Sequence, residues 1–197
     1  MSSPARDVAG DVDLVAALAD SQRLGMLGDR PVAEVIEHAG AFVLALAEVT
    51  GTVVDLGSGG GVPGLVIARA RPDLRLVLVD RRSSRTDHLQ RLVARLDVAD
   101  RCEVLTVDAT SFGGRRAGSA AAVVARSFGA PAVTLRAAAP LVRAGGLVVV
   151  SEPPNPDLGR WPQELLDRLG LVATAQMDRR VVVFRRPDAA QPERPKP

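Results

Sequence analysis

The sequence predicts an α/β protein with a Rossmann-like, doubly wound and mostly parallel sheet of seven strands, completed by an antiparallel C-terminal strand. From Thr52 onward, short apolar runs suited to strands alternate with runs whose apolar residues recur at helical spacing. This alternation is typical of a parallel sheet with helices on both faces. A glycine-rich turn follows the first strand, and two runs near the C-terminus are close enough in sequence to form an antiparallel hairpin.

The predicted elements begin with two helices, from Asp13 to about Leu24 and from Pro31 to Val49, which form an N-terminal lead-in over residues 1–50 packed on the core. The second has apolar side chains at helical spacing. The remaining elements are predicted as strand 52–56, helix 63–70, strand 74–79, helix 84–97, strand 102–107, strand 121–125, helix 131–143, strand 146–151, a helix near 161–169, and strands 171–177 and 181–185.

Length and composition favour one domain. A chain of 197 residues, 47% of them apolar, suits a single well-buried core, which we place at residues 51–186. Residues 187–197 are rich in proline and charge, so we expect a disordered tail. No apolar run reaches the roughly 20 residues of a membrane span, and the first twenty residues do not resemble a secretory signal. We therefore expect a cytoplasmic protein with no membrane partner.

The cysteine and histidine content predicts no metal site. Cys102 is the single cysteine, so it cannot form an intramolecular disulfide. One cysteine and two distant histidines, His38 and His88, offer no spacing for a structural metal. We interpret Cys102 as a structural residue.

The glycine-rich segment that follows the first strand is typical of a nucleotide-cofactor loop. Gly57, Gly59 and Gly61 lack a Cβ, which lets the chain take positive φ and lets a ligand approach the backbone. Pro63 suits the first turn of the next helix, where its missing N–H costs least. A helix N-terminus beside a glycine turn attracts the polar end of a cofactor.

Two cofactor classes fit this loop. The glycines match G-x-G-x-x-G, and Asp80 at the end of the second strand could bind ribose hydroxyls, as in dinucleotide enzymes. However, the chain has no tyrosine, and its one lysine, Lys196, lies in the tail. This composition excludes a Tyr-Lys proton-donating pair and a phosphate loop of the G-x-x-x-x-G-K-[ST] type.

Asp55 extends the glycines to Asp-x-Gly-x-Gly-x-Gly, which resembles the first motif of class I S-adenosylmethionine-dependent methyltransferases. The resemblance implies that the loop holds the methionine and ribose of the cofactor, Asp80 the ribose hydroxyls and Asp108 the adenine. Asp108 could equally be a turn residue at a strand end. The expected cofactor-binding residues are Asp55, Gly57, Ser58, Gly59, Gly61, Asp80, Arg81, Asp108, Ala109 and Arg126.

Four segments together resemble a narrower group, the bacterial RsmG (GidB) family. They are Asp55-Leu-Gly-Ser-Gly-Gly-Gly-Val-Pro-Gly-Leu, Leu78-Val-Asp-Arg-Arg-Ser-Ser-Arg85, Val124-Ala-Arg-Ser-Phe128 and Asp178-Arg-Arg-Val-Val-Val-Phe-Arg185. The resemblance implies an S-adenosylmethionine-dependent methyltransferase that modifies N7 of a guanine in small-subunit ribosomal RNA. Its implied partner is that RNA or the small ribosomal subunit, and we favour a monomer.

Arg126, at the end of the fourth strand, is the candidate catalytic residue. We expect it to hold an RNA phosphate, a base edge or the carboxylate of the cofactor; pairing with Asp55 or Asp108 is the alternative. Guanine N7 carries a lone pair and no proton, so its methylation needs placement of the reactants rather than a general base. Phe128 and Trp161 are candidates for stacking on a base.

The chain departs from the family pattern in two places. After the fifth strand the family carries Lys-Gly, whereas this chain has Ser151-Glu152-Pro153-Pro154, so an acid stands where a cation is usual. His38 lacks its usual neighbours and is interpreted as a core histidine of an apolar helix. One alternative hypothesis is a methyltransferase of the same fold that acts on a small molecule or on another RNA site. The other is a catalytically inactive S-adenosylmethionine-binding protein with a ribosome-associated or regulatory role.

Overall fold

The computed structural model describes residues 6–177 and 180–188. The helices are α1 Val12–Arg23, α2 Val32–Ala45, α3 Gly64–Ala70, α4 Ser83–Arg95, α5 Ala109–Arg115, α6 Pro131–Ala138 and α7 Gln163–Leu169, with a short 3-10 turn, η1, at Leu158–Arg160. The strands are β1 Thr52–Leu56, β2 Arg75–Asp80, β3 Cys102–Thr106, β4 Ala120–Ala125, β5 Val142–Ser151, β6 Val172–Met177 and β7 Val181–Arg185. Most of the predicted disordered tail, residues 189–197, lies outside the described residues.

The seven strands form one sheet in the order β3-β2-β1-β4-β5-β7-β6. Neighbouring strands from β3 to β5 are parallel, and β7 runs antiparallel to both β5 and β6. This confirms the predicted fold class, including the antiparallel C-terminal strand. Because the chain turns back between β3 and β4, β1 and β4 are neighbours at a topological switch point, where open α/β sheets bind ligands beyond the carboxyl ends of the strands.

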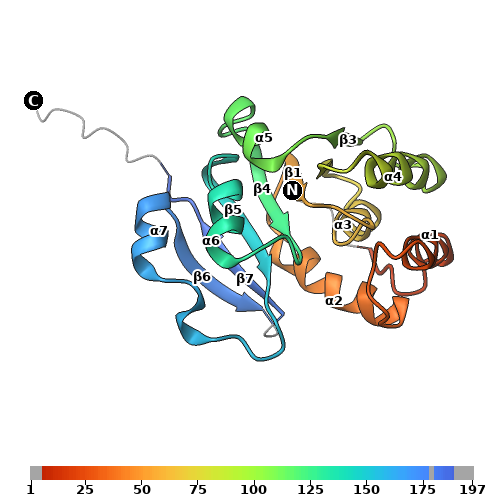
Figure 1. The fold of residues 1–197 in the computed structure, drawn as a ribbon, viewed down its shortest axis with the longest axis horizontal. Coiled ribbons are helices and arrows are strands. Elements are labelled where there is room, and N and C mark those ends of the chain that lie inside the picture. Colours follow the sequence, from red (N-terminus) through yellow and green to blue (C-terminus); the bar gives the residue numbers. More distant parts are fainter. Residues whose placement is uncertain (1–5, 178–179, 189–197) are drawn as a thin grey trace, which may run out of the picture.

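Helices cover both faces of the sheet (Figure 1). The apolar side chains of α1 to α4 pack on one face around Leu65 and Leu78, and those of α5 to α7 pack on the other around Leu135 and Val148. Strand residues alternate between these two cores, as the strand period of two requires. The N-terminal lead-in therefore packs on the same face as α3 and α4.

The structure corrects the predicted elements between β3 and the end of α6. Helix α5 was not predicted, because its seven residues include Gly113 and Gly114, which are poor helix formers. Asp108 caps this helix by accepting a hydrogen bond from the Thr110 N–H at 2.9 Å. Helix α6 ends at Ala138 rather than at residue 143, since Pro140 has no N–H with which to continue the helical hydrogen bonds.

Strand β5 begins at Val142, earlier than predicted, but its pairing with β4 is interrupted. Val142 pairs with Ala120, and regular pairing resumes only at Leu147 opposite Ala122. Gly145, at φ +72°, lies in the irregular segment between them. The predicted start at residue 146 is therefore close to the start of the regular ladder.

Helix α2 ends at Ala45, four residues before its predicted end, and Arg71 accounts for the difference. The guanidinium of Arg71 is buried and donates hydrogen bonds to the carbonyls of Leu46 at 2.5 Å, Ala47 at 3.3 Å and Val49 at 2.8 Å. These carbonyls are satisfied by a side chain instead of by a further helical turn. Asp73 accepts two more hydrogen bonds from the same guanidinium.

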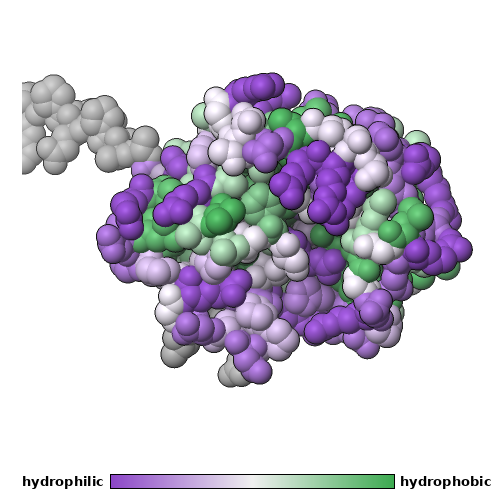
Figure 2. Space-filling model, in the orientation of Figure 1, coloured by the Kyte–Doolittle hydropathy of each residue, from purple (hydrophilic) through white to green (hydrophobic). Residues whose placement is uncertain are grey.

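Within the described ranges, no helix combines the length and apolar character that crossing a membrane requires. Charged and polar side chains cover most of the face seen in Figure 2, and hydrophobic side chains appear there only in small separate groups.

Candidate functional site

The glycine loop is fixed to the neighbouring strand β2 by its backbone. The N–H groups of Gly57 and Ser58 both donate to the carbonyl of Val79, at 2.8 and 3.0 Å. Gly57, Gly59 and Gly61 have φ values of +69°, +52° and +96°, which residues with a Cβ rarely adopt. The sequence thus forms the tight turn that the glycine spacing predicts.

Asp55, the last residue but one of β1, is fully buried beneath this loop. Its Oδ2 accepts a hydrogen bond from the Gly64 N–H at the start of α3, at 3.0 Å. Its Oδ1 is also buried and has no hydrogen-bond partner in the described part of the chain. Burial raises the pKa of this carboxyl to about 7, although the Gly64 N–H and the positive charge of Arg126 act in the opposite direction.

Asp80 ends β2 and is 5% exposed. Its Oδ2 accepts from the Gly59 N–H at 3.1 Å and lies 3.5 Å from Nη1 of Arg85, while its Oδ1 accepts from the Arg82 N–H at 3.0 Å. The carboxylate is therefore held in one orientation at the carboxyl end of the strand.

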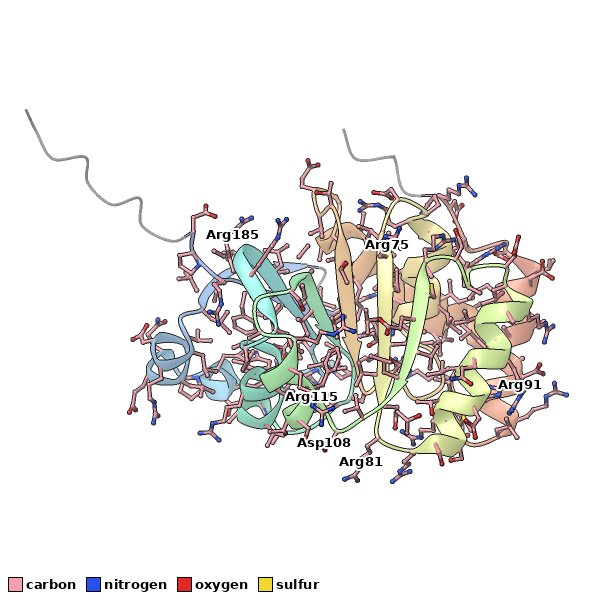
Figure 3. The ribbon with its side chains drawn as sticks, turned by 90° about the horizontal axis from the view of Figure 1, so that it is seen from above. Arg75, Arg81, Arg91, Asp108, Arg115 and Arg185 are labelled. Atoms are coloured by element: carbon pink, nitrogen blue, oxygen red, sulfur yellow. The ribbon has the colours of Figure 1, made fainter. Side chains whose placement is uncertain are left out.

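A cavity of about 410 Å³ opens beside this carboxylate, between the ends of β1, β2, β3 and β4. The sequence-predicted residues that line it are Gly57, Asp80, Arg81, Asp108 and Ala109. Figure 3 shows Arg81 and Asp108 at this end of the sheet, with Arg75 at the opposite end. The volume is in the range of about 300–1,000 Å³ that suits a ligand of cofactor size.

The other predicted cofactor residues do not line this cavity. Asp55 and Ser58 are buried under the loop, where the Ser58 hydroxyl donates to the Asp55 carbonyl at 2.9 Å. Gly59 and Gly61 shape the turn itself. The group expected from the sequence, S-adenosylmethionine, fits the lining as a whole, because acids at the ends of β2 and β3 offer acceptors for hydroxyl and amine groups.

A second, larger cavity of about 560 Å³ lies next to the first, under the loop that joins α1 to α2. Arg30 from that loop, Arg126 from the end of β4 and Arg180 from the β6–β7 connection all line it. Arg180 pairs with Glu37, at 2.8 Å between Nη2 and Oε1. Three positive charges from separate segments thus converge on one hollow.

His38 on α2 also lines this larger cavity, which corrects its interpretation as a core histidine. It is half-buried, and burial is the main cause that lowers its pKa. The positive charges of Arg126, Arg180 and Arg30 lower the pKa further. The imidazole is therefore kept neutral in a positively charged environment.

Arg126 itself makes no ion pair with any residue that the structure describes. Burial lowers the pKa of its guanidinium, the Asp55 carboxylate raises it and Arg30 lowers it. Arg126 lines the larger cavity and not the cofactor-sized one. The geometry thus disfavours the alternative in which Arg126 is committed to an acid of the protein.

Ser127 lies where the two cavities meet, since it lines both. It adopts φ +52°, an uncommon value for a residue with a side chain, and its N–H donates to Oγ of Ser151 at 3.3 Å. The next residue, Phe128, lines the smaller cavity. A strained turn therefore directs Arg126 to one cavity and Phe128 to the other.

Glu152, the acid that follows β5, does not present a free negative charge to the larger cavity. Its side chain is 1% exposed and lies 3.2 Å from Nε of Arg160, measured at Oε2. Its other oxygen accepts a hydrogen bond from the indole N–H of Trp161. Glu152, which stands where the family carries a lysine, is therefore paired with side chains of the protein itself.

Arg30 and Arg180 are site residues that were not predicted from the sequence. Arg180 belongs to an arginine-rich, family-like segment of the sequence, and Arg30 lies in the loop that follows the first helix. Nothing in the local sequence signals their convergence, because they are 150 residues apart and meet only through the packing of α2 beside β7.

Comparison with known protein families places this sequence near one group. The profile described as "GidB: rRNA small subunit methyltransferase G" matches residues 17–152. A protein named Ribosomal RNA small subunit methyltransferase G from Mycobacterium marinum is 33% identical over 184 residues, covering 86% of this chain and 80% of the relative. The protein of that name from a Nocardioides species is 39% identical over 119 residues, covering 56% of this chain and 46% of the relative.

The match to several relatives is partial. The chain spans about half the length of the Nocardioides, Acidothermus cellulolyticus and Salinispora tropica relatives, at 46%, 48% and 47% of their sequences. Among solved structures, a cofactor-bound protein from MTB, Rv0187, matches with a TM-score of 0.64 and 22% identity, covering 93% of this chain and 92% of that one. An O-methyltransferase family protein from Burkholderia thailandensis matches with a TM-score of 0.63 and 16% identity, covering 89% and 58%. These two likenesses concern the fold.

Proposed function

Because the chain belongs to the rRNA small subunit methyltransferase G (GidB) family, we propose that it is an S-adenosylmethionine-dependent methyltransferase that acts on guanine N7 of small-subunit ribosomal RNA. The observation that carries this proposal is the meeting of two cavities at Ser127. One is cofactor-sized and has Asp80 and Asp108 in its lining; the other gathers three arginines.

The smaller cavity suits the cofactor. Asp80 would accept hydrogen bonds from the ribose hydroxyls, and Asp108, Ala109 and Arg81 would border the adenine. The backbone of Gly57 to Gly61 would approach the methionine part closely, because no Cβ is present there. When bound, S-adenosylmethionine supplies a methyl group activated by a sulfonium sulfur.

The larger cavity suits the RNA. Arg30, Arg126 and Arg180 would neutralise phosphates of the acceptor strand, and arginine provides a fork of donors that matches a phosphate. Arg180 is paired with Glu37, whereas the charges of Arg30 and Arg126 oppose each other in the free protein, and an anionic ligand would relieve this repulsion. A neutral His38 adds no further charge to this hollow.

The chemistry asks little of the protein beyond placement. Guanine N7 uses its in-plane lone pair to form the new N–C bond, the electrons of the broken C–S bond stay on sulfur, and no proton moves. The residues therefore need only to align the base, exclude water and tolerate a cationic ring. Phe128, which follows Ser127 and lines the cofactor-sized cavity, is placed to stack on that ring.

Three measurements test this proposal. Calorimetric titration should detect binding of S-adenosylmethionine and not of NADP, and the protein should transfer a labelled methyl group to small-subunit ribosomal RNA from a strain that lacks the gene. Deletion of the gene should remove one N7-methylguanine from that RNA. An unchanged methylation map, in a strain without a second family member, would reject the ribosomal substrate, and binding without transfer to any RNA would favour an inactive protein.

A further inference from the structure

A cluster at the carboxyl end of β5 has no role in the arrangement described so far. It consists of Glu152, Arg160 and Trp161. Nε of Arg160 lies 3.2 Å from Oε2 of Glu152, and its guanidinium carbon lies 5.2 Å from the centre of the Trp161 ring. Trp161 is anchored in turn by an edge-to-face contact with Phe184 of β7, at 5.0 Å between ring centres. The cluster thus fixes an arginine on a rigid support.

The guanidinium of Arg160 is held in place, but its hydrogen-bond donors are not all used. Although its Nε and the Glu152 Oε2 are close, they lack the alignment of a hydrogen bond, and both are buried without one. The Arg160 side chain makes no hydrogen bond to any residue that the structure describes. Buried polar groups in this state are uncommon and call for a partner. With one edge against Glu152 and one face over Trp161, the terminal donors of Arg160 stay available to a ligand.

Arg160 lines a small hollow of about 180 Å³. Ser127, Phe128, Ser151 and Glu152 are among the residues that line it together with Arg160. Ser127 also borders the cofactor-sized cavity and the arginine-lined one. The hollow is smaller than the 300 Å³ or so at which drug-sized ligands begin to fit, so it suits one small polar group.

We propose that Arg160 binds a phosphodiester group of the acceptor RNA strand next to the target base, with Glu152 and Trp161 as its positioning residues. The inference rests on the proposed function. A phosphate is the group that a planar fork of donors recognises best. Glu152 offsets part of the Arg160 charge, but its carboxylate lies on the Nε side of the guanidinium and also accepts from the Trp161 indole N–H, which leaves the terminal donors of Arg160 to the phosphate.

The test compares RNA binding by wild-type protein and by Arg160→Met over a series of salt concentrations, with unmodified small-subunit ribosomal RNA as the probe. Loss of one phosphate contact should lower the slope of log affinity against log salt by about 0.7 for a single strand. The KM for RNA should rise about tenfold, with kcat and the affinity for S-adenosylmethionine unchanged. Arg168→Met is the matched control, because Arg168 is 65% exposed on α7 and its one ion pair among the described residues is with Glu164; its slope should equal that of the wild type.

A double variant separates this role from a structural ion pair. Glu152→Gln with Arg160→Met removes both charges and keeps an acceptor for the Trp161 indole. If the pair only stabilises the fold, the double variant should recover the melting temperature, the salt slope and the KM together. On our proposal it recovers the melting temperature alone. Arg160→Lys retains the charge but not the fork, so it should keep the salt slope and still raise the KM.

The outcomes also separate this inference from the proposed function. A wild-type protein that binds RNA but transfers no methyl group would contradict the proposed function, while the salt slopes would still test Arg160. Wild-type transfer with an unchanged slope and KM in Arg160→Met would overturn the Arg160 inference and leave the methyltransferase intact. An equal loss in Arg168→Met would also overturn it, since a general loss of positive charge would then explain the effect.

Discussion

The ring of Phe128 lies against the α-carbon of Gly57, so that a Cβ added at Gly57 would lie 2.7 Å from Cδ2 of Phe128. These two residues are 71 positions apart, one after β1 and one after β4, and they are in contact at the switch point of the sheet. Because both border the cofactor-sized cavity, their contact relates the glycine loop to the site where the acceptor base would stack.

Gly57→Ala should therefore damage cofactor binding. The substitution combines positive φ, which costs an alanine roughly 1–2 kcal/mol, with displacement of the Phe128 ring. We expect the affinity for S-adenosylmethionine to fall about tenfold or more in a calorimetric titration. Gly118→Ala is a matched control, since Gly118 has φ +63° but open space around it; it should lose some stability and keep its cofactor affinity. Equal affinities in all three proteins would contradict the prediction.

Asp80→Asn should weaken cofactor binding while leaving the fold intact. The amide of asparagine has one acceptor oxygen, so the hydrogen bond from either the Gly59 N–H or the Arg82 N–H is lost. The carboxylate that would accept from the ribose hydroxyls is lost as well. Hydrogen bonds to charged groups contribute about 1.5–3 kcal/mol, which corresponds to an affinity loss of roughly 10- to 100-fold. The measurement is again calorimetric, and Asp87→Asn, at an exposed position of α4, serves as the control. Wild-type affinity in Asp80→Asn would remove Asp80 from the cofactor site.

Arg126→Ala should abolish methyl transfer and spare cofactor affinity, because Arg126 lines the arginine-lined cavity and not the cofactor-sized one. Single-turnover transfer to RNA and calorimetry with S-adenosylmethionine give the two readouts. Arg143→Ala, an exposed position near the start of β5, should behave as wild type. A large loss of cofactor affinity in Arg126→Ala would instead assign Arg126 to the cofactor carboxylate.

The burial of Asp55 predicts a pH-dependent stability. The pKa of Asp55 rises from 3.8 to about 7 on folding. Between about pH 4 and pH 7, the folded state therefore keeps a proton that the unfolded state has released. The free energy of unfolding should therefore fall as the pH rises through this window. His38 and His88, whose pKa values are lowered, act in the opposite direction. The difference between wild type and Asp55→Asn in urea unfolding isolates the effect, and parallel curves from pH 4 to pH 8 would contradict it.

Arg71→Met should destabilise the protein without a specific effect on catalysis. The variant would leave Asp73 without its partner and would leave the carbonyls at the end of α2 without their donors. Leaving buried backbone acceptors without donors costs about 1–3 kcal/mol for each group, which urea unfolding would detect. Arg75→Met, at the exposed start of β2, is the control and should change stability by less than about 0.5 kcal/mol. A difference below about 1 kcal/mol between the two variants would contradict this role for Arg71.

The order of strands and helices and the position of the glycine loop could be predicted because they depend on local patterns. These patterns lie within short segments of the chain: the alternation of apolar runs, the spacing of Gly57, Gly59 and Gly61, and the acids at strand ends. The boundaries that were wrong depend on distant residues. The end of α2 is decided by Arg71, which lies 22 to 25 positions after the carbonyls that it binds.

The sequence by itself determined the fold class, the family and the loop that suits S-adenosylmethionine, because strand period, helix period and glycine spacing act within a few residues. Only the tertiary structure decided which side chains share a cavity. It brought Arg30, Arg126 and Arg180 together around one hollow and joined Glu152 to Arg160 and Trp161. Such arrangements depend on the strand order at the switch point and on the packing of α2 beside β7, so they cannot be predicted from any local sequence pattern.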